Sequence, residues 1–344
     1  MESPRMYRPP YAMWYNFVQI RNPIFRGGIP MKVFITGGTG NIGQYVTLEL
    51  LKRGHEAVVL SRSPEKYPTL AAMKNVMLVG GLITDYDLMG RMIKDCDAII
   101  HIALGWGDEP ISMFLMDTEA TVHLLEMAEK AGVKKFMYTS STAAMGEMRP
   151  VMNETVMNLP LDLYGSTKSA SEAFVLGFRA YYGAERTGGN SVAMKRNVIR
   201  PGYTFSNPPY PDGSSQSDTR FRDIADAVVK NETVRVTLHD GTQFLSSGQI
   251  AQLYADLLES DQNEQVFLAL SSDFTTWERV AQIALEEYPQ SASKIACIDK
   301  AWNPVPNLYQ VAKIKDVFGL DFHGEEELSA HVRWNLQKAA ERIK

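Results

Sequence analysis

A glycine-rich segment constrains the fold of this chain most. The sequence TGGTGNIG, residues 36–43, follows a short apolar run at Lys32 to Thr36 and opens a helical pattern that extends from Asn41 to Arg53. In such a turn one glycine permits the tight bend, one lets the backbone approach a pyrophosphate, and one allows close helix-on-strand packing. The helix N-terminus adds free N–H groups and a positive dipole end. The residues expected to bind a dinucleotide here are Gly37, Gly40, Asn41, Ile42 and Gly43.

Strand and helix patterns alternate from Met31 to about Arg200, which is typical of βαβ units and a parallel sheet. The predicted strands are Lys32–Thr36, Glu56–Ser61, Asn75–Val79, Ala98–Ala103, Lys135–Thr139 and Ser191–Arg200. Two long helices are predicted at Ile111–Ala131 and Leu161–Arg179. We therefore expect an α/β fold, a doubly wound parallel sheet of the Rossmann type, over residues 31–205.

The pattern changes after Pro201, where a loop rich in Pro, Asn and Gly begins. Shorter elements follow at Ile250–Glu259, Val266–Leu270 and Thr275–Tyr288, and we assign residues 206–344 mainly to a smaller α+β lobe that binds substrate. Residues 1–30 mix aromatic residues with prolines. They are interpreted either as an unstructured leader or as an arm that packs on a partner subunit.

The composition narrows the classes of partner. The chain has 344 residues and a formal net charge of −5, without the clustered Lys and Arg that nucleic-acid binding needs. No apolar run reaches the roughly 20 residues of a membrane span, and no signal-peptide pattern is visible. Cys96 and Cys297 lie far apart, which indicates neither a disulfide framework nor a metal site. We expect a cytoplasmic protein whose partner is a small molecule, with no nucleic acid, membrane or metal.

Two segments carry side chains suited to acid–base chemistry. Ser140 and Ser141 end the fifth predicted strand, at the sheet edge where ligands bind in such folds. Tyr164 and Lys168 are four residues apart in a predicted helix, so their side chains share one face. A second pair with this spacing, Tyr309 and Lys313, lies in the C-terminal lobe. We interpret that second pair as an ordinary helical face, and expect Tyr309→Phe to have little effect.

The TGGTGNIG turn together with the Tyr164–Lys168 pair resembles the extended short-chain dehydrogenase/reductase family, which includes the nucleotide-sugar epimerases and dehydratases. The resemblance covers roughly Met31 to Tyr288. Family members place a Ser or Thr five residues before the glycine of the segment that follows the fifth strand, which selects Ser141, with Thr142 as the alternative. The resemblance also implies that Lys168 holds the nicotinamide ribose.

The chemistry expected of Tyr164 follows from its pKa. A free tyrosine has a pKa near 10 and is a poor base at neutral pH. A neighbouring Lys168 ammonium and a positive nicotinamide would both favour the phenolate. Tyr164 could then take or give the hydroxyl proton while hydride moves to or from the nicotinamide, and Ser141 would hydrogen-bond the substrate oxygen. The predicted catalytic residues are therefore Ser141, Tyr164 and Lys168.

The end of the second strand bears on the choice of cofactor. An NAD site usually has an acidic residue there, whereas this chain has Ser61 followed by Arg62. A guanidinium suits a 2′-phosphate, so NADP is expected, with NAD as the alternative and a solvated Arg62 as the plain interpretation. Family members usually have Gly-Asp after the third strand, where this chain has Gly81-Leu82. The further cofactor contacts expected are Leu82, Ala103, Tyr164, Lys168 and Pro201.

Departures from the family pattern bear on the reaction. Thr142-Ala143 stands where dehydratases carry an Asp-Glu pair, which argues against elimination of water. The nucleotide-sugar enzymes usually have an Asn after the sixth strand, where this chain has Arg200-Pro201-Gly202. They have an Arg before a Phe in the C-terminal lobe, which binds the diphosphate, where this chain has Gln243-Phe244. A buried Asp often follows in the family, whereas this chain has Ser247-Gly248-Gln249. These differences argue against a standard UDP-sugar. Trp106, Ser141, Met145, Tyr203 and Phe205 are the predicted substrate contacts, with simple core packing of the apolar ones as the alternative.

The sequence thus predicts an NAD(P)-dependent oxidoreductase that moves hydride between nicotinamide and a carbonyl or alcohol of a small molecule. Two alternatives remain: a sugar or nucleotide-sugar epimerase, and a non-catalytic dinucleotide-binding sensor. Family members pair two long helices across a two-fold axis, and the second helix here carries Phe174, Val175, Leu176 and Phe178 in succession. The resemblance therefore implies a homodimer through Ile111–Ala131 and Leu161–Arg179.

Overall fold

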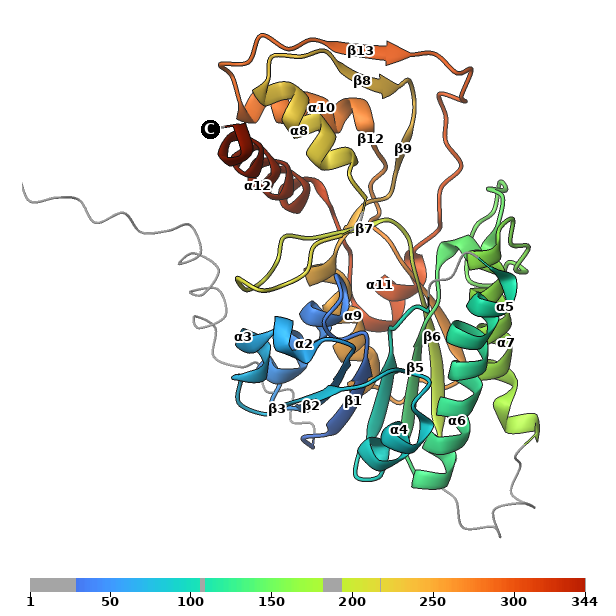
Figure 1. Ribbon diagram of the computed structural model, residues 1–344. Coiled ribbons are helices and arrows are strands. Elements are labelled where there is room, and N and C mark those ends of the chain that lie inside the picture. The colour runs from blue at the N-terminus through green and yellow to red at the C-terminus, as the bar shows by residue number, and fades with distance from the viewer. Residues whose placement is uncertain (1–28, 106–108, 182–193, 217, 344) are drawn as a thin grey trace, which may run out of the picture.

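One parallel sheet organises the chain. The structure, a computed structural model, describes residues 29–105, 109–181, 194–216 and 218–343. Within them seven strands are hydrogen-bonded in the order β11-β6-β5-β4-β1-β2-β3 (Figure 1). They are β1 Lys32–Thr36, β2 Glu56–Ser61, β3 Val76–Gly80, β4 Ala98–His101, β5 Lys135–Thr139, β6 Lys195–Pro201 and β11 Gln265–Ala269. All six pairings are parallel, so the predicted doubly wound sheet is confirmed.

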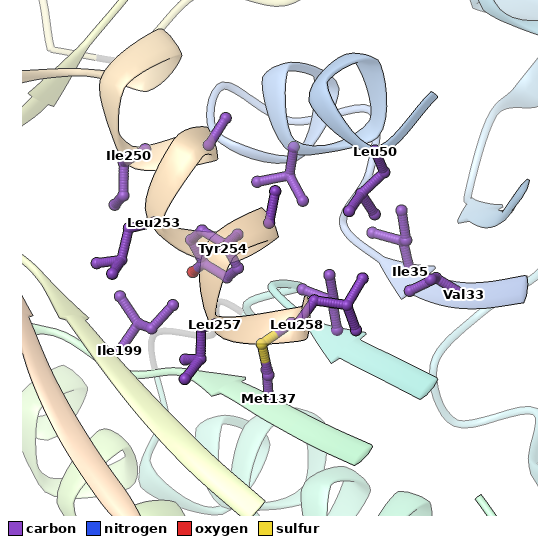
Figure 2. Close-up of a cluster of buried hydrophobic side chains, with 14 of the residues drawn as sticks. Val33, Ile35, Leu50, Met137, Ile199, Ile250, Leu253, Tyr254, Leu257 and Leu258 are labelled. Carbon is purple, nitrogen blue, oxygen red and sulfur yellow. The ribbon is translucent and has the colours of Figure 1, made fainter. Parts of the chain in front are cut away.

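Helices cover both faces of this sheet because successive strand residues point to opposite sides. Val33 and Ile35 face a cluster with the helices α2 Gly43–Lys52, α9 Ser247–Glu259 and α11 Ala312–Phe318. Figure 2 shows α9 side chains lying against β1, β5 and β6 in this cluster. Phe34 points the other way, toward α4 Tyr86–Ile93, α6 Ala120–Ala131 and α7 Leu163–Tyr181. Both faces bury the apolar residues of the central strands, as parallel sheets require, whereas the edge strand β3 is partly exposed.

The first predicted long helix is irregular. It comprises α5 Pro110–Met113, a π-helical segment at Phe114–Glu119, and then α6, which ends at Gly132 in the left-handed region with φ 73°. A π-helical segment inserts extra residues into a helical turn and is frequent at functional sites. Here it carries Asp117, whose side chain is buried against α7. The irregularity therefore places an acidic group inside the protein.

The boundary of the large sheet differs from the sequence prediction. Ile250–Glu259 and Val266–Leu270 were expected in the C-terminal lobe, whereas α9 packs on the sheet and β11 pairs with β6 as its seventh strand. The physical reason is burial: Phe267, Leu268 and Ala269 have no exposed surface, because α9 and α11 cover one face of this edge strand and Met145 and Met152 lie on the other. Part of the chain after residue 206 thus completes the dinucleotide-type domain.

The remaining C-terminal elements form a lobe above the strand ends (Figure 1). Its helices are α8 Arg220–Val229, α10 Trp277–Glu287 and α12 Glu325–Ile343, and its strand pairs are β8 Val234–Thr237 with β13 Ile295–Ile298, β7 Thr204–Phe205 with β10 Leu245–Ser246, and β9 Gly241–Thr242 with β12 Thr275–Thr276. Aromatic side chains of Phe205, Phe221, Phe244 and Trp277 fill its core. The short helix α3 Pro68–Ala71 follows β2. No helix of the described ranges is long and apolar enough to cross a membrane.

Candidate active site

The glycine turn packs so closely that two of its positions exclude a side chain. Gly37 has φ 71°, and a Cβ there would lie 2.6 Å from the backbone nitrogen of Ala103 at the end of β4. A Cβ on Gly43 would lie 2.1 Å from the carbonyl oxygen of Gly37. The turn therefore brings bare backbone and the first turn of α2 to the C-terminal edge of the sheet. This is the shape that a pyrophosphate needs from its binding loop.

A loop from the second half of the chain is hydrogen-bonded to this helix, and no sequence pattern predicts that contact. The Ser206 hydroxyl donates to the Asn41 side chain, and the Tyr45 hydroxyl donates to the carbonyl of Asn207 at 2.8 Å. Asn207 also shares a 2.8 Å hydrogen bond with His331 of α12. The Ser214 N–H donates to Gln44 Oε1 at 2.9 Å. We call residues 206–214 the clasp, because they connect α2 with the lobe.

The other predicted cofactor contacts surround the same sheet edge. Arg62 is exposed directly after β2. Leu82 follows β3 and is 55% exposed, so its apolar side chain lies at the surface beside the strand ends. Pro201 ends β6, paired with Ala269 of β11. The structure thus places Arg62, Leu82, Ala103 and Pro201 at or after the carboxyl ends of β2, β3, β4 and β6, all on the same edge of the sheet.

The three predicted catalytic residues lie together. Ser141 lies two residues after β5 in extended conformation, and its side-chain oxygen accepts a 3.1 Å hydrogen bond from the N–H of Ala143. Tyr164 lies in the first turn of α7, and a hydrogen bond links its side chain to that of Ser141. The Lys168 Nζ is 6.0 Å from the centre of the Tyr164 ring, one helical turn further on. The end of β5 and the start of α7 therefore bring the hydroxyl groups of Ser141 and Tyr164 together.

Lys168 is buried, with 2% of its surface exposed. Its Nζ donates to Asp117 Oδ1 at 3.2 Å and to the carbonyl of Thr139 at 3.2 Å. Burial lowers the pKa of Lys168, and the Asp117 carboxylate counteracts that effect. Sequence reasoning missed Asp117. The signal that could have found it is an acidic residue within the apolar pattern of a long helix.

Burial dominates the acidity of Tyr164. Loss of solvation raises the pKa of its phenol, because the charged form is disfavoured away from water. The hydrogen bond with Ser141 acts in the opposite direction, and the charges of Asp117 and Asp162 raise the pKa further. At neutral pH the phenol therefore carries its proton.

A buried histidine lies beneath this site. His101 ends β4, and its ring nitrogens contact the Thr36 hydroxyl at 2.7 Å and the Thr121 hydroxyl at 3.0 Å. Burial, with a smaller contribution from the charge of Lys168, lowers the pKa of His101 to about 3. The ring is consequently neutral at physiological pH. It connects β1 with α6 behind Asp117.

The predicted substrate contacts fall into different places. Met145 is 0% exposed and packs with Met152 and Leu270, and Phe205 is 1% exposed in the lobe core. Both are corrected to core residues, because a side chain without exposed surface cannot meet a substrate. Tyr203 is partly exposed and lies 5.0 Å, centre to centre, from the ring of Phe244. Trp106 lies outside the described residues.

The second tyrosine–lysine pair is not a helical face. Tyr309 precedes α11 and bridges to Met152, and its side chain forms a hydrogen bond with Thr142, next to Ser141. Gln243 holds its backbone through bonds of 2.7 and 3.0 Å. Lys313 instead turns to the carbonyl of Val266 at 2.8 Å. The interpretation of this pair as an ordinary helical face was therefore wrong, since Tyr309 lies in an extended segment that runs beside Thr142.

Family comparison supports this architecture. A sequence model described as the NAD dependent epimerase/dehydratase family matches residues 33–268. The chain is 28% identical over 212 residues to a 3 beta-hydroxysteroid dehydrogenase/Delta 5-->4-isomerase of Mycobacterium tuberculosis, an alignment that covers 58% of this chain and 52% of the relative. It is 29% identical over 150 residues to a UDP-glucose 4-epimerase of Lacticaseibacillus casei, covering 42% and 47%. The chain thus spans about half the length of these relatives.

Solved structures share the fold over nearly the whole chain. A UDP-N-acetylglucosamine 4-epimerase from Methanobrevibacter ruminantium, in complex with UDP-N-acetylmuramic acid, superposes with a TM-score of 0.74 at 19% identity, covering 90% of this chain and 99% of that one. A UDP-glucuronic acid 4-epimerase from Bacillus cereus in complex with NAD gives 0.73 at 17% identity, covering 91% and 100%. Together with the match over residues 33–268, the sheet order and the glycine turn, these findings establish that the chain belongs to the NAD dependent epimerase/dehydratase family.

Proposed function

We propose that this protein is an NAD(P)-dependent oxidoreductase that acts on a carbonyl or alcohol of a small molecule. The observation that supports it best is the hydrogen-bonded pair of Ser141 and Tyr164 beside Lys168, at the sheet edge that also holds the glycine turn. A sensor that only binds a dinucleotide has no use for a tyrosine placed to transfer a proton. The same machinery serves reduction, oxidation and epimerisation, so substrate recognition must distinguish them.

The residues divide the work in reduction as follows. When bound, the reduced cofactor supplies hydride to the carbonyl carbon. Tyr164 is protonated at neutral pH and can therefore act as the acid. As hydride reaches the carbonyl carbon, the O–H bond of Tyr164 breaks and its proton joins the carbonyl oxygen, which gives the alcohol. Ser141 donates a hydrogen bond to the same oxygen and stabilises the charge that develops on it. The phenolate then regains a proton from water.

The glycine turn fits a dinucleotide because Gly37 and Gly43 let the turn, the end of β4 and the start of α2 pack closely, which brings backbone N–H groups to the sheet edge where a pyrophosphate would bind. We assign the pyrophosphate to the N-terminus of α2, and the adenosine to the surface between Arg62 and Leu82. The exposed guanidinium of Arg62 favours a 2′-phosphate and hence NADP, because no acidic residue ends β2. Lys168 would hold the nicotinamide ribose with the proton that Asp117 and Thr139 leave free.

Internal pairing of polar groups supports a small substrate over a nucleotide sugar. Gln243 directs its amide nitrogen to the carbonyls of Ser271 and Tyr309, and its oxygen accepts from the Tyr309 N–H. Arg220 is bound by Asp218, with its Nε 2.9 Å from Oδ2, and stacks 4.3 Å from the centre of the Trp277 ring. Neither side chain is therefore free for a diphosphate. The carbonyl substrate would enter between the strand ends and the lobe, past Thr142 and Tyr309.

Epimerase activity is the second candidate. The lobe contains a hollow of about 340 Å³ beside Arg220, Asp240 and Trp277, which is large enough for a flat ring system. The UDP-sugar epimerases among the solved structures make a nucleotide sugar the natural occupant to test. Binding there would require Arg220 to exchange Asp218 for the ligand.

A homodimer completes the proposal. Ile111, Phe114, Leu115 and Phe174 are exposed apolar residues on α5, the adjoining π-helical segment and α7, which contact each other. A cluster of large exposed apolar side chains on neighbouring helices is typical of a protein interface. Val175 and Phe178, by contrast, are buried within the subunit. The same helices of a second copy would cover these exposed apolar side chains.

A cytoplasmic location of the protein stays a prediction.

The test is an assay of cofactor oxidation. NADPH and NADH are mixed with the protein and a panel of aldehydes, ketones and UDP-sugars, and the products are identified by NMR. We expect a carbonyl to be reduced, and Tyr164→Phe to lose about 10²–10⁴-fold in turnover while its cofactor affinity is retained. Inversion of a UDP-sugar without net cofactor oxidation would identify an epimerase. Cofactor binding with no turnover on any substrate would favour the sensor.

A further inference from the structure

The ion pair beneath Tyr164 is isolated from water. Asp117 has no exposed surface and Lys168 has 2%, and 3.2 Å separates Oδ1 from Nζ. The second carboxylate oxygen of Asp117 has no hydrogen-bond partner among the described residues. The π-helical segment Phe114–Glu119 is what turns Asp117 inward. A buried pair of this kind is costly to desolvate and is weak evidence for stability, so its retention calls for another explanation.

The pair changes the field at the phenol. Lys168 lies 6.0 Å from the centre of the Tyr164 ring, where an unpaired ammonium would lower the titration midpoint of the phenol by about two pH units at an effective dielectric constant of about 20. The carboxylate of Asp117 contacts this same Lys168 ammonium and carries the opposite charge. Seen from the phenol, the two charges form a small dipole whose net effect is much weaker than either charge alone.

Other titratable and charged groups that face the site act on Tyr164 and Lys168 less than Asp117 does. They are Asp162 just before α7, Glu172 of α7, His101 of β4, Tyr138 of β5 and Tyr254 of α9. Glu172 is paired with Arg200 through bonds of 2.8 and 2.7 Å, and His101 is neutral. Asp162 is exposed and accepts a bond from the Gly165 N–H. Asp117 is the described carboxylate in direct contact with Lys168.

We propose that Asp117 is a positioning residue that cancels the charge of Lys168 toward Tyr164, so that the phenol stays protonated and the site works as an acid on a carbonyl oxygen. The inference deepens the proposed function, because it specifies reduction as the favoured direction at neutral pH. Lys168 keeps its place and its hydrogen bonds but gives little help to the phenolate. Oxidation of an alcohol would then need a more alkaline medium than reduction of the carbonyl.

The phenol itself can be titrated without substrate or cofactor. The ring carbon that bears the hydroxyl is labelled with ¹³C in every tyrosine, and the Tyr164 signal is identified by its absence in Tyr164→Phe. We expect Asp117→Asn to lower the midpoint by about one to two pH units, since the ammonium is then unbalanced. Lys168→Met should raise it. An unchanged or higher midpoint in Asp117→Asn would overturn the proposal.

A double variant controls for the possibility that the single variants misfold. Each single change leaves a buried charge alone, whereas Asp117→Asn with Lys168→Met removes both charges together. We expect the double variant to titrate Tyr164 within about half a pH unit of wild type, because the pair is nearly neutral toward the phenol. A rise of more than about one pH unit would mean that Lys168 dominates the field and that Asp117 does not cancel it.

The titration also separates this inference from the proposed function. If the midpoints move as expected but no carbonyl is reduced, the charge balance stands and the oxidoreductase proposal fails. If a carbonyl is reduced, the fall in kcat at alkaline pH should shift in Asp117→Asn by the same interval as the phenol midpoint. A merely structural Asp117 would lower kcat equally at every pH, and that result would overturn the inference while leaving the oxidoreductase in place.

Discussion

Two buried histidines should make the folded protein sensitive to mild acid. Burial lowers the pKa of His101 to about 3 and that of His331 to about 4, whereas an unfolded histidine titrates near 6.5. The unfolded chain therefore binds more protons below pH 6.5, so stability is complete above that pH and is lost as the pH falls toward 4 and 3. Each group costs about 1.4 kcal/mol per pH unit in this window, or about 2 kcal/mol at pH 5. Together they remove about 4 kcal/mol.

Urea unfolding at pH 7 and at pH 5, followed by circular dichroism, measures this loss. His331→Met removes one titrating group while keeping an apolar side chain beside Phe205 and Phe221, so the loss between the two pH values should fall to about half. His323→Gln is the matched control, because His323 is exposed and its replacement should leave the loss as it is in wild type. The reasoning is refuted if His331→Met loses as much stability as wild type between pH 7 and pH 5.

Four further results are expected. Arg62→Ala should remove a tenfold to hundredfold preference for NADP over NAD, measured by calorimetric titration, because a charge-assisted bond is worth about 1.5–3 kcal/mol; equal wild-type affinities would contradict this. Tyr309→Phe should raise KM about threefold to tenfold with little change in kcat, since a hydroxyl at the substrate entrance is lost, and an unchanged KM would place Tyr309 outside the pocket. Glu172→Leu should cost about 3–5 kcal/mol in urea unfolding because it strands a buried arginine, whereas Glu287→Gln in an exposed pair should cost under about 1 kcal/mol; similar costs would contradict the difference. Sedimentation should show a dimer that Phe174→Glu converts to monomers, and a wild-type monomer at micromolar concentration would exclude the interface.

The features predicted correctly from the sequence depend on short spacings. The strand–turn–helix around Gly37 and the helical placement of Tyr164 and Lys168 follow from residues that are close in the chain. The sheet type followed from apolar strand patterns that alternate with helical ones. These predictions hold in the folded structure because residues close together in the chain determine each of these features.

The features that sequence reasoning missed depend on contacts between distant segments. β11 has the same pattern as a lobe strand, and only its pairing with β6 places it in the sheet. Tyr309 lies four residues before Lys313, but the backbone is extended there, so the helical spacing carried no meaning. In the sequence Asp117 is one polar residue within a helical pattern, and only the π-helical segment of the structure directs its side chain toward α7. Tertiary packing overrides local pattern in each case.

The clasp bears on the order in which ligands bind. Asn207 is held on one side by Tyr45 of α2 and on the other by His331 of α12, so the lobe and the phosphate-binding helix share one tether. Outward movement of the lobe pulls on that tether and on Ser206, which touches Asn41 in the turn itself. If the proposed dinucleotide binds at this turn, its entry would require a wider opening of the lobe than entry of a smaller substrate. The tether therefore predicts an ordered kinetic scheme in which the dinucleotide binds first and leaves last.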